Sequence, residues 1–342
     1  MSLALLRGGP LLDEFRQLDP GLEVLDERRH RRDQVRRVVR RAHAEALLPA
    51  LAADPVLDVT GYDALWVNSV ASLRCLPTAG PRPPVVLHLH ELEYAISRLL
   101  PQASDRARLQ LPDHIVAASQ EAAESVVRVH QVEQRRVSVV EEFLPDGTAA
   151  GGSRQQDPPL VVAAGSLEWR KGADLFVAAA LAHRRAHPGS PVRWVWFGAG
   201  QDPVTQAQLA FDIAQAGLTG VVEVRPAVAD LTDVLVTASV FVLPSREDPF
   251  PLVVLEAARA GLPVVCFEGA GGAAGFAGRG AGVAVPYADS GAMAAAVQRY
   301  LADEALRADV GAAGRRQVQE RHTVARAGPR LLDVLHSVLR TP

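Results

Sequence analysis

The 342-residue chain has few cysteines, no long apolar run and no large excess of charge of either sign. Its two cysteines, Cys75 and Cys266, are too few for a disulfide framework or a cysteine-rich metal site. No apolar stretch reaches the roughly 18–20 residues of a membrane-spanning helix, and residues 1–7 lack the charged-then-apolar order of a signal peptide. A formal net charge of −3 excludes a chain-wide nucleic-acid-binding surface. We therefore expect a cytoplasmic globular protein without a nucleic-acid partner.

Lysine and asparagine are also scarce. The 36 basic residues are 35 arginines and one lysine, Lys171, and Asn68 is the single asparagine. Codon bias in a GC-rich genome explains the general preference for arginine. A lysine that escapes such bias can mark a position where a compact ammonium, unlike a planar guanidinium, is required. Composition alone leaves both interpretations of Lys171 open.

Short apolar runs alternate with helical patterns along the chain, which predicts βα units and parallel sheets. The expected strands of the first half are residues 3–6, 22–25, 64–67, 85–89, 114–117 and 137–140. Those of the second half are residues 160–164, 192–197, 221–224, 240–243, 264–267 and 282–285. We therefore expect an α/β fold of two doubly wound, Rossmann-like domains, with a ligand cleft at the carboxyl ends of the strands.

The boundary between the two predicted domains is a segment of unusual composition. Residues 148–159 (TAAGGSRQQDPP) have neither hydrophobic periodicity nor apolar content, which is typical of an interdomain linker. The predicted domains are accordingly residues 1–147 and 160–322. The apolar spacing over residues 323–342 predicts a closing amphipathic helix.

The most informative stretch is residues 240–267, VFVLPSREDPFPLVVLEAARAGLPVVCF. A strand leads into a proline-rich loop that carries Asp248, and a helix is expected to begin near Pro251 or Leu252. The free N–H groups and the dipole of a helix start favour anions. Glu256 lies eight positions after Asp248, so one acid on the loop and one on the helix suit the hydroxyls of a sugar and a ribose beside a diphosphate. Solvated loop charges and a helix-favouring glutamate would give the same pattern.

Two further strands are predicted to end in glycine turns. The strand over residues 160–164 leads into Gly165 and then Arg170-Lys171-Gly172, and two cations beside a glycine turn can hold a phosphate. The turn is not a P-loop, because the glycine spacing and the Ser/Thr after the lysine are both missing. Residues 198–200, Gly-Ala-Gly, end another strand in the same manner. A solvated Arg-Lys pair is the alternative interpretation.

Together, the loop over residues 245–256 and the turns at 170–172 and 198–200 resemble glycosyltransferase family four. Its members are retaining enzymes of the GT-B fold that use nucleotide-activated sugars, and the similarity covers residues 160 to about 302. The resemblance implies transfer of a hexose from a nucleotide diphosphate sugar to a hydroxyl acceptor, with retention and without a metal or other cofactor. The implied acceptor is a polysaccharide, a glycolipid or a small molecule.

The resemblance also implies roles for individual residues. Asp248 would meet the hydroxyls of the transferred sugar, Glu256 those of the ribose, and Lys171 the diphosphate. Ser166 stands where the family has an arginine, which leaves charge neutralisation to Lys171, helped by Arg170. The other donor-side candidates are Gly165, Gly198, Glu247 and the segment Phe250, Pro251, Leu252 and Val253, whose backbone amides would meet the diphosphate.

The first domain matches the family less completely. Residues 84–94, PVVLHLHELEY, form a predicted strand that ends near His88 and His90. Similar family members place a histidine here, facing the transferred sugar, so the resemblance implies that role for His90. Asn68 ends the preceding strand and is expected to face the same cleft. A strand-capping histidine and a turn-initiating asparagine are the alternatives. With Lys171 and Asp248, His90 completes the candidate catalytic set.

The start of the chain departs from the family pattern. Family members open with a strand and a glycine-bearing loop, whereas residues 3–9 resemble the strand that follows. On this basis roughly 30–50 residues, one βα unit with its loops, are expected to be missing. An inactive remnant that binds a nucleotide sugar is therefore one rival function. A sugar-nucleotide epimerase is another, although the loop with Asp248 and Glu256 matches transferases better.

Residues 26–46 carry eight arginines, from Arg28 to Arg41, with valines and alanines at helical spacing. This pattern predicts an amphipathic helix with a basic face. A solvated face is the usual explanation of such a pattern. A contact with an anionic membrane surface or a lipid-phosphate acceptor is the alternative, and it leaves a peripheral location at the inner face of a membrane open.

Overall fold

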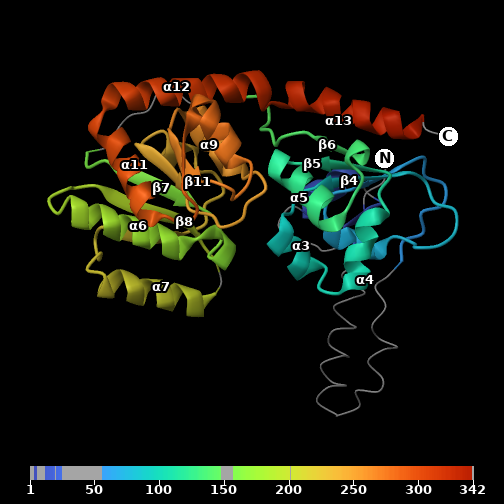
Figure 1. Ribbon diagram of the computed structural model, residues 1–342, viewed down its shortest axis with the longest axis horizontal. Helices are drawn as coiled ribbons and strands as arrows, with labels where there is room; N and C mark the ends of the chain where they lie inside the picture. The colour runs from blue at the N-terminus through green and yellow to red at the C-terminus, as the bar shows by residue number, and fades with distance from the viewer. Residues whose placement is uncertain are drawn as a thin grey trace, which may run out of the picture. The chain divides into compact units, whose positions relative to one another are not determined.

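The structure is a computed structural model that describes residues 4–5, 12–19, 21–24, 56–147, 157–200 and 202–340 (Figure 1). It divides into two compact units, one of residues 1–63 and 71–83 and the other of residues 64–70 and 84–342. The basic helix expected over residues 26–46, including Arg28 and Arg41, lies outside the described residues, as does most of the expected linker. The boundaries of the two predicted domains stay a prediction.

The smaller unit contains a short parallel pair of strands. β1 (Ala4–Leu5) pairs with β2 (Glu23–Val24), and α1 (Leu12–Leu18) lies between them in sequence. The first turn of α1 carries Asp13 and Glu14, which the positive end of the helix dipole favours. Both strands lie where the sequence predicts them.

In the larger unit, a six-stranded parallel sheet has the strand order β12-β11-β10-β7-β8-β9 (Figure 1). Its strands are β7 (Leu160–Ala164), β8 (Arg193–Ala199), β9 (Val222–Pro226), β10 (Val240–Leu243), β11 (Val264–Phe267) and β12 (Gly282–Val285). Numbered from β7, this order is 6-5-4-1-2-3, which is the order of the doubly wound dinucleotide-binding fold. All six strands lie where the sequence predicts strands.

Both faces of this sheet are covered because its strands are apolar on both sides. The helices that contribute buried side chains to one face are α9 (Leu252–Ala260), α10 (Ala273–Phe276) and α12 (Glu304–Arg321), and those of the other face are α6 (Ala173–Ala186), α7 (Pro203–Gln215) and α11 (Ser290–Ala302). The core on the face covered by α6, α7 and α11 includes the fully buried rings of Trp194, Trp196 and Phe176. Shorter elements are the 3-10 turn η6 (Trp169–Lys171), α8 (Thr232–Leu235) and the π turn η7 (Ala277–Ala281).

A four-stranded parallel sheet is built in the order β3-β4-β5-β6. Its strands are β3 (Leu65–Val67), β4 (Val85–Leu89), β5 (His114–Ala117) and β6 (Val137–Val139). The connecting helices are α3 (Glu93–Leu99), α4 (Ala103–Arg106) and α5 (Gln120–His130), with 3-10 turns η3 (Val70–Cys75), η4 (Ala107–Gln110) and η5 (Gln134–Arg136). Again, each strand lies where the sequence predicts one.

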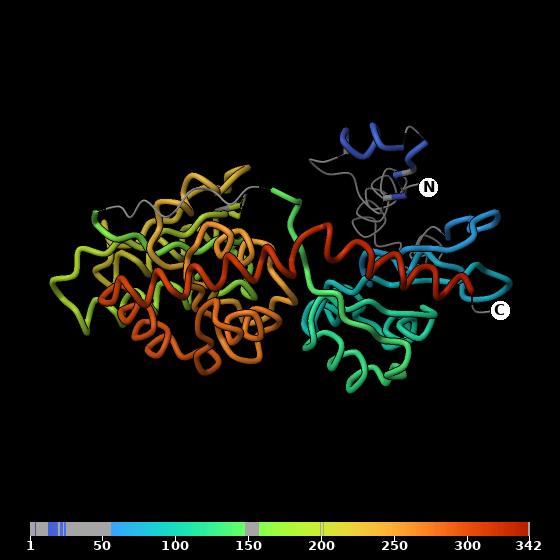
Figure 2. The backbone as a smooth tube through the Cα atoms, turned by 90° about the horizontal axis from the view of Figure 1, so that it is seen from above, coloured from blue at the N-terminus to red at the C-terminus, as the bar shows by residue number. Residues whose placement is uncertain are grey.

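The last helix, α13 (Val324–Leu339), confirms the predicted amphipathic helix at the end of the chain. Its Ala327 and Val338 pack with Val86, Val116 and Val140, which belong to β4, β5 and the segment after β6. Figure 2 shows α13 running along the part of the chain that forms the four-stranded sheet. The C-terminal segment therefore completes the core of strands that precede it by about 200 residues.

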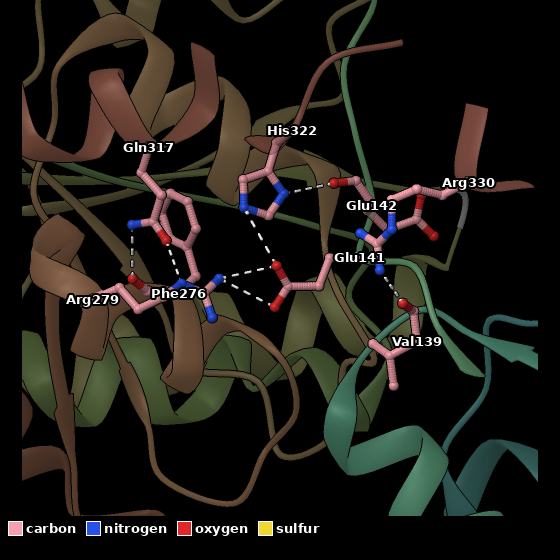
Figure 3. Close-up of polar contacts among 8 residues, drawn as sticks. All are labelled: Val139, Glu141, Glu142, Phe276, Arg279, Gln317, His322 and Arg330. Carbon is pink, nitrogen blue, oxygen red and sulfur yellow. Dashed lines mark hydrogen bonds and ion pairs between the residues drawn. The ribbon is translucent and has the colours of Figure 1, made fainter. Parts of the chain in front are cut away.

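A polar cluster fixes the segment after β6 to the turn between α12 and α13 (Figure 3). Nδ1 of the fully buried His322 donates to the backbone carbonyl of Glu142 at 2.8 Å. Arg279 donates to both carboxylate oxygens of Glu141 at 3.1 Å. Arg330 donates to the backbone carbonyl of Val139 at 2.6 Å. These bonds hold the chain where it passes from α12 to α13.

Gly172 is required where η6 meets α6. Its φ is 75°, and an added Cβ would overlap the backbone carbonyl of Pro244. We predict that Gly172→Ala lowers the free energy of unfolding by about 1–3 kcal/mol, as expected for a strained left-handed residue. Urea denaturation measures the change. The control is Gly189→Ala, where an added Cβ meets nothing within 4 Å and we expect a change below about 0.5 kcal/mol. Equal losses in both variants would contradict the prediction.

Candidate functional site

The loops that follow β7 and β10 lie against one another. The backbone N–H of Arg246 donates to the carbonyl of Arg170 at 2.7 Å. The guanidinium of Arg246 forms two bonds with the Asp174 carboxylate, at 2.9 and 2.6 Å, and lies 4.8 Å from the centre of the Trp169 ring. Because β7 and β10 are neighbours in the sheet, two loops far apart in the sequence form one surface at its carboxyl edge.

Lys171 and Asp248 are in direct contact on this surface. Nζ of Lys171 lies 2.5 Å from Oδ2 of Asp248, and the Ser245 hydroxyl lies 3.4 Å from the same oxygen. The Asp248 backbone N–H donates to the carbonyl of Ala270 at 2.8 Å, and Asp248 is only 6% exposed. A buried charge is tolerated only when it is paired, so each of the two groups depends on the other. The structure thus brings together two of the three candidate catalytic residues.

The glycine turns at Gly165 and Gly198 also meet. The Trp196 indole N–H and the Gly165 carbonyl are 2.9 Å apart, and the Gly165 N–H donates to the carbonyl of Phe197 at 2.9 Å. Gly198 has a φ of 119°, and a Cβ there would overlap the Gly165 backbone. Packing of the two turns therefore requires glycine at Gly198 whether or not a ligand binds. Ser166, the next residue along β7's loop, is exposed.

The start of α9 differs from the expected anion site in one respect. The helix begins at Leu252, as predicted, and Pro251 is its N-cap with a φ of −73°. Proline has no backbone N–H, so the expectation that Pro251 offers an amide to a diphosphate is wrong. Of the four residues predicted for that role, Phe250, Leu252 and Val253 can donate. Pro251 instead fixes the backbone angle at the point where the helix begins.

Glu247, predicted to bind substrate, is occupied by the backbone of α3. Its two carboxylate oxygens accept the N–H groups of Tyr94, at 2.7 Å, and of Ala95, at 2.9 Å. The first N–H groups of a helix have no partner within the helix, and Leu92, the N-cap of α3, supplies no side-chain bond. Glu247 fills this role from another part of the chain.

The two other charged candidates near the loop have different environments. The Arg170 guanidinium lies 3.0 Å from the Glu168 carboxylate, so its charge is partly neutralised in this structure. Glu256 is half-buried on α9. Burial raises the pKa of Glu256, the charge of Asp230 adds to that effect, and Arg259 opposes it.

A second group of predicted residues lies at the carboxyl edge of the β3–β6 sheet. Nδ1 of His90 is 2.6 Å from Oε1 of Glu142, and Nε2 of His90 is 3.2 Å from Oδ1 of Asn68. The rings of His88 and His90 have centroids 4.0 Å apart. The pKa of His88 is lowered to about 4, mainly by burial and also by the charge of His90, while Glu142 opposes both effects. The structure therefore places Asn68 and His90 together at one edge of the sheet, as predicted. His88 and Glu142 belong to the same group.

The part that Glu142 plays in this group was not predicted from the sequence. Its signal was available, because Glu142 follows β6 by three residues and β6 neighbours β5 in the same sheet. Glu91, the residue after His90, is also buried here and accepts a hydrogen bond from the Ser69 hydroxyl at 2.6 Å. Burial raises the pKa of Glu91, and the bond from Ser69 opposes that effect. Among the described residues, His88, His90 and Glu142 are a group with the spacing of metal ligands.

Comparison with known proteins finds a family match in the second half of the chain. Residues 158–303 match the family model of glycosyl transferases group 1. D-inositol 3-phosphate glycosyltransferase from Streptomyces avermitilis is 32% identical over 226 residues, which are 60% of this chain and 48% of the relative. Glycogen synthase from Mycobacterium tuberculosis is 33% identical over 149 residues, 43% of this chain and 35% of the relative. The chain spans about half the length of the inositol-phosphate glycosyltransferases it matches.

Solved structures show the same fold at low sequence identity. HepE from Anabaena in complex with UDP-glucose superposes with a TM-score of 0.72 at 18% identity, covering 98% of this chain and 91% of that one. Sucrose-phosphate synthase from Thermosynechococcus elongatus gives a TM-score of 0.66 at 20% identity, with coverages of 82% and 75%. The fold is the GT-B fold of two parallel-sheet, Rossmann-like domains, which confirms the predicted fold class. In the part of the chain that the structure describes, no helix meets the length and apolarity needed to cross a bilayer.

Glu256 supplies a test of the electrostatics of the loop. Because burial raises its pKa above the value in the unfolded chain, the charged form destabilises the folded protein. For an acid whose pKa is raised by folding, the contribution to the free energy of unfolding is favourable at low pH. That contribution is lost as the pH rises through the pKa of the folded state. We predict that Glu256→Gln unfolds at a higher urea concentration than the wild type at pH 7, and that the difference shrinks near pH 4. Glu320→Gln, on the exposed side of α12, is the control. A destabilised Glu256→Gln at pH 7 would refute the prediction.

Proposed function

We propose that the protein is a retaining glycosyltransferase that moves a hexose from a nucleotide diphosphate sugar to a hydroxyl acceptor. The observation that carries the proposal is the contact of Lys171 with Asp248 at the strand edge of the region that matches glycosyl transferases group 1. The names of the relatives support it, since several are glycosyltransferases. A protein of the same fold is known in complex with UDP-glucose.

The donor is proposed to lie over the loops after β7 and β10. Lys171 would face the diphosphate, and its ammonium has three donors, so it can keep Asp248 and still bind a phosphate oxygen. The free N–H groups of Leu252 and Val253 at the start of α9 would add favourable dipoles. Asp248 would accept hydrogen bonds from the sugar and Glu256 from the ribose.

Catalysis is proposed to be mainly electrostatic. A departing nucleoside diphosphate gains negative charge, and Lys171 with the start of α9 places positive potential where that charge develops. These groups belong to the chain itself, so we assign no metal ion to the transfer step. His90 and Asn68 are proposed to face the transferred sugar. The acceptor class is a polysaccharide, a glycolipid or a small molecule, and a cytoplasmic or membrane-peripheral location is part of the same proposal.

Calorimetry tests the donor site. UDP, GDP and ADP are titrated separately into the full chain, and at least one of them is expected to bind. The matching nucleotide sugars are then assayed for transfer to a panel of hydroxyl acceptors, including D-inositol 3-phosphate and glycogen. No binding of any nucleotide by folded protein would overturn the donor site. Binding without transfer to any acceptor would favour the nucleotide-sugar-binding remnant.

Lys171 is the sharpest single test of the donor site. We predict that Lys171→Ala weakens binding of the preferred nucleoside diphosphate by about 1.5–3 kcal/mol, the range for hydrogen bonds to charged groups. Lys171→Arg is expected to restore only part of the loss, because a planar fork replaces a point charge. Calorimetry measures both variants, and Arg185→Ala on the exposed side of α6 is the control. Wild-type affinity in Lys171→Ala would show that the single lysine has no part in binding.

His90 tests the separation of binding from transfer. We predict that His90→Ala keeps the nucleoside diphosphate affinity of the wild type, because that affinity comes from the loops after β7 and β10. Its turnover is expected to fall by about 100-fold, the typical effect of removing one group that stabilises the transition state. The assay is initial-rate transfer at saturating donor. Unchanged turnover would remove His90 from the catalytic set.

A further inference from the structure

Three side chains with metal-ligating atoms meet at the carboxyl edge of the β3–β6 sheet. His88, His90 and Glu142 each offer one such atom, and these atoms all lie within 4.8 Å of one another. His88 and His90 are two positions apart on one strand and its continuation, so their rings lie on the same side of the sheet. Glu142 reaches them from the segment after β6. Two imidazoles and one carboxylate are a ligand set that catalytic zinc sites use.

We propose that His88, His90 and Glu142 bind a Zn²⁺ ion. Zinc holds histidine nitrogen and carboxylate oxygen at about 2.0–2.2 Å, usually in a tetrahedron with water as the fourth ligand. Ligand atoms in such a tetrahedron are about 3.4 Å apart. The separation in the structure is at most 4.8 Å, so small side-chain rotations close the site.

The hydrogen bonds of His90 favour this arrangement. Both of its ring nitrogens face oxygen atoms, those of Glu142 and of Asn68. A neutral imidazole has one N–H and one nitrogen that can bind a metal. Zn²⁺ would bind Nδ1 of His90 and Oε1 of Glu142, which already lie 2.6 Å apart. Asn68 would keep the remaining N–H, as the outer partner of a zinc-bound histidine ordinarily does.

His88 supplies the second nitrogen. Its side chain is buried, and the Trp66 ring lies 5.7 Å away in an edge-on contact. A site with two imidazoles also discriminates against Mg²⁺, which requires an octahedron of oxygen ligands. The group therefore suits Zn²⁺ rather than the divalent ion that accompanies nucleotides.

Zinc at this position would inhibit sugar transfer. This inhibition rests on the proposed function, which places His90 against the transferred sugar. Zinc binding itself does not depend on the proposed function. An ion on Nδ1 would fix the His90 ring and add positive charge beside it. A chelator would relieve the inhibition, because zinc binding leaves the three side chains chemically unchanged.

The first experiment is calorimetry of the full, chelator-treated chain with ZnCl₂. We expect one ion per chain. MgCl₂ is expected to give no binding at this group. His88→Asn and Glu142→Gln are expected to weaken zinc binding at least tenfold, and Asn68→Ala about 10–100-fold, as outer partners do.

His114→Asn is the matched control, because His114 lies on the neighbouring strand β5 and bonds Ser138 instead. It is expected to bind zinc as the wild type does. Circular dichroism shows whether each variant folds. If His88→Asn does not fold, the wild-type chain loaded with Co²⁺ provides the second measurement. The visible bands of tetrahedral cobalt are expected to appear and to disappear when zinc is added.

Three outcomes would overturn the zinc site: no zinc binding, wild-type zinc affinity in both His88→Asn and Glu142→Gln, or cobalt bands typical of six oxygen ligands. The inhibitory role has its own test, which is the transfer rate with and without one equivalent of zinc. Zinc binding with an unchanged rate would overturn inhibition and leave the site. Zinc binding in a chain that binds no nucleoside diphosphate would overturn the proposed function and leave the site.

Discussion

The contact of Lys171 with Asp248 is the interaction on which the second domain's loop surface depends. It joins a turn after β7 to a loop after β10, and both partners are largely removed from water. Neither charge would be tolerated there alone. Two further contacts hold the same two loops together. The Arg246 guanidinium binds the Asp174 carboxylate, and the Arg246 backbone N–H donates to the Arg170 carbonyl. Gly172 allows the close approach of the loops by having no Cβ.

This arrangement also explains why one lysine stands in a chain of arginines. The ammonium of Lys171 approaches a single carboxylate oxygen at 2.5 Å. A guanidinium is wider and would present two parallel donors to Asp248, which uses one oxygen for Lys171 and for the Ser245 hydroxyl. Arginine does serve elsewhere on the same surface, where Arg246 meets both oxygens of Asp174. The two cations thus follow the geometry of the acids that they meet.

Periodicity and strand order allowed much of this to be predicted from the sequence. Each strand is a short apolar run bounded by turn residues, and parallel strands bring their carboxyl-end loops together, so Lys171 and Asp248 could be assigned to one surface. The partners of Glu142 and Glu247 could not be predicted in this way, although Glu142 follows a predicted strand. The bond of Glu142 to His90 spans 52 residues, and that of Glu247 to Tyr94 spans 153. Local patterns report the neighbours of a residue along its own strand or helix, whereas these contacts depend on how separate loops pack. For the same reason, the sequence predicts the C-terminal helix but not the sheet against which it packs.

Glu247 and Asp248 show how adjacent residues in one loop come to have separate duties. Asp248 is buried against Lys171, while the Glu247 carboxylate accepts two N–H groups at the start of α3. The segment from His90 to Tyr94 therefore begins in the polar group around Asn68 and Glu142 and ends on a side chain of the donor loop. Substitution of Glu247 would leave two N–H groups of α3 without that partner, and its effect would include the position of this segment. A loss of activity in such a variant would therefore not by itself show that Glu247 contacts a substrate.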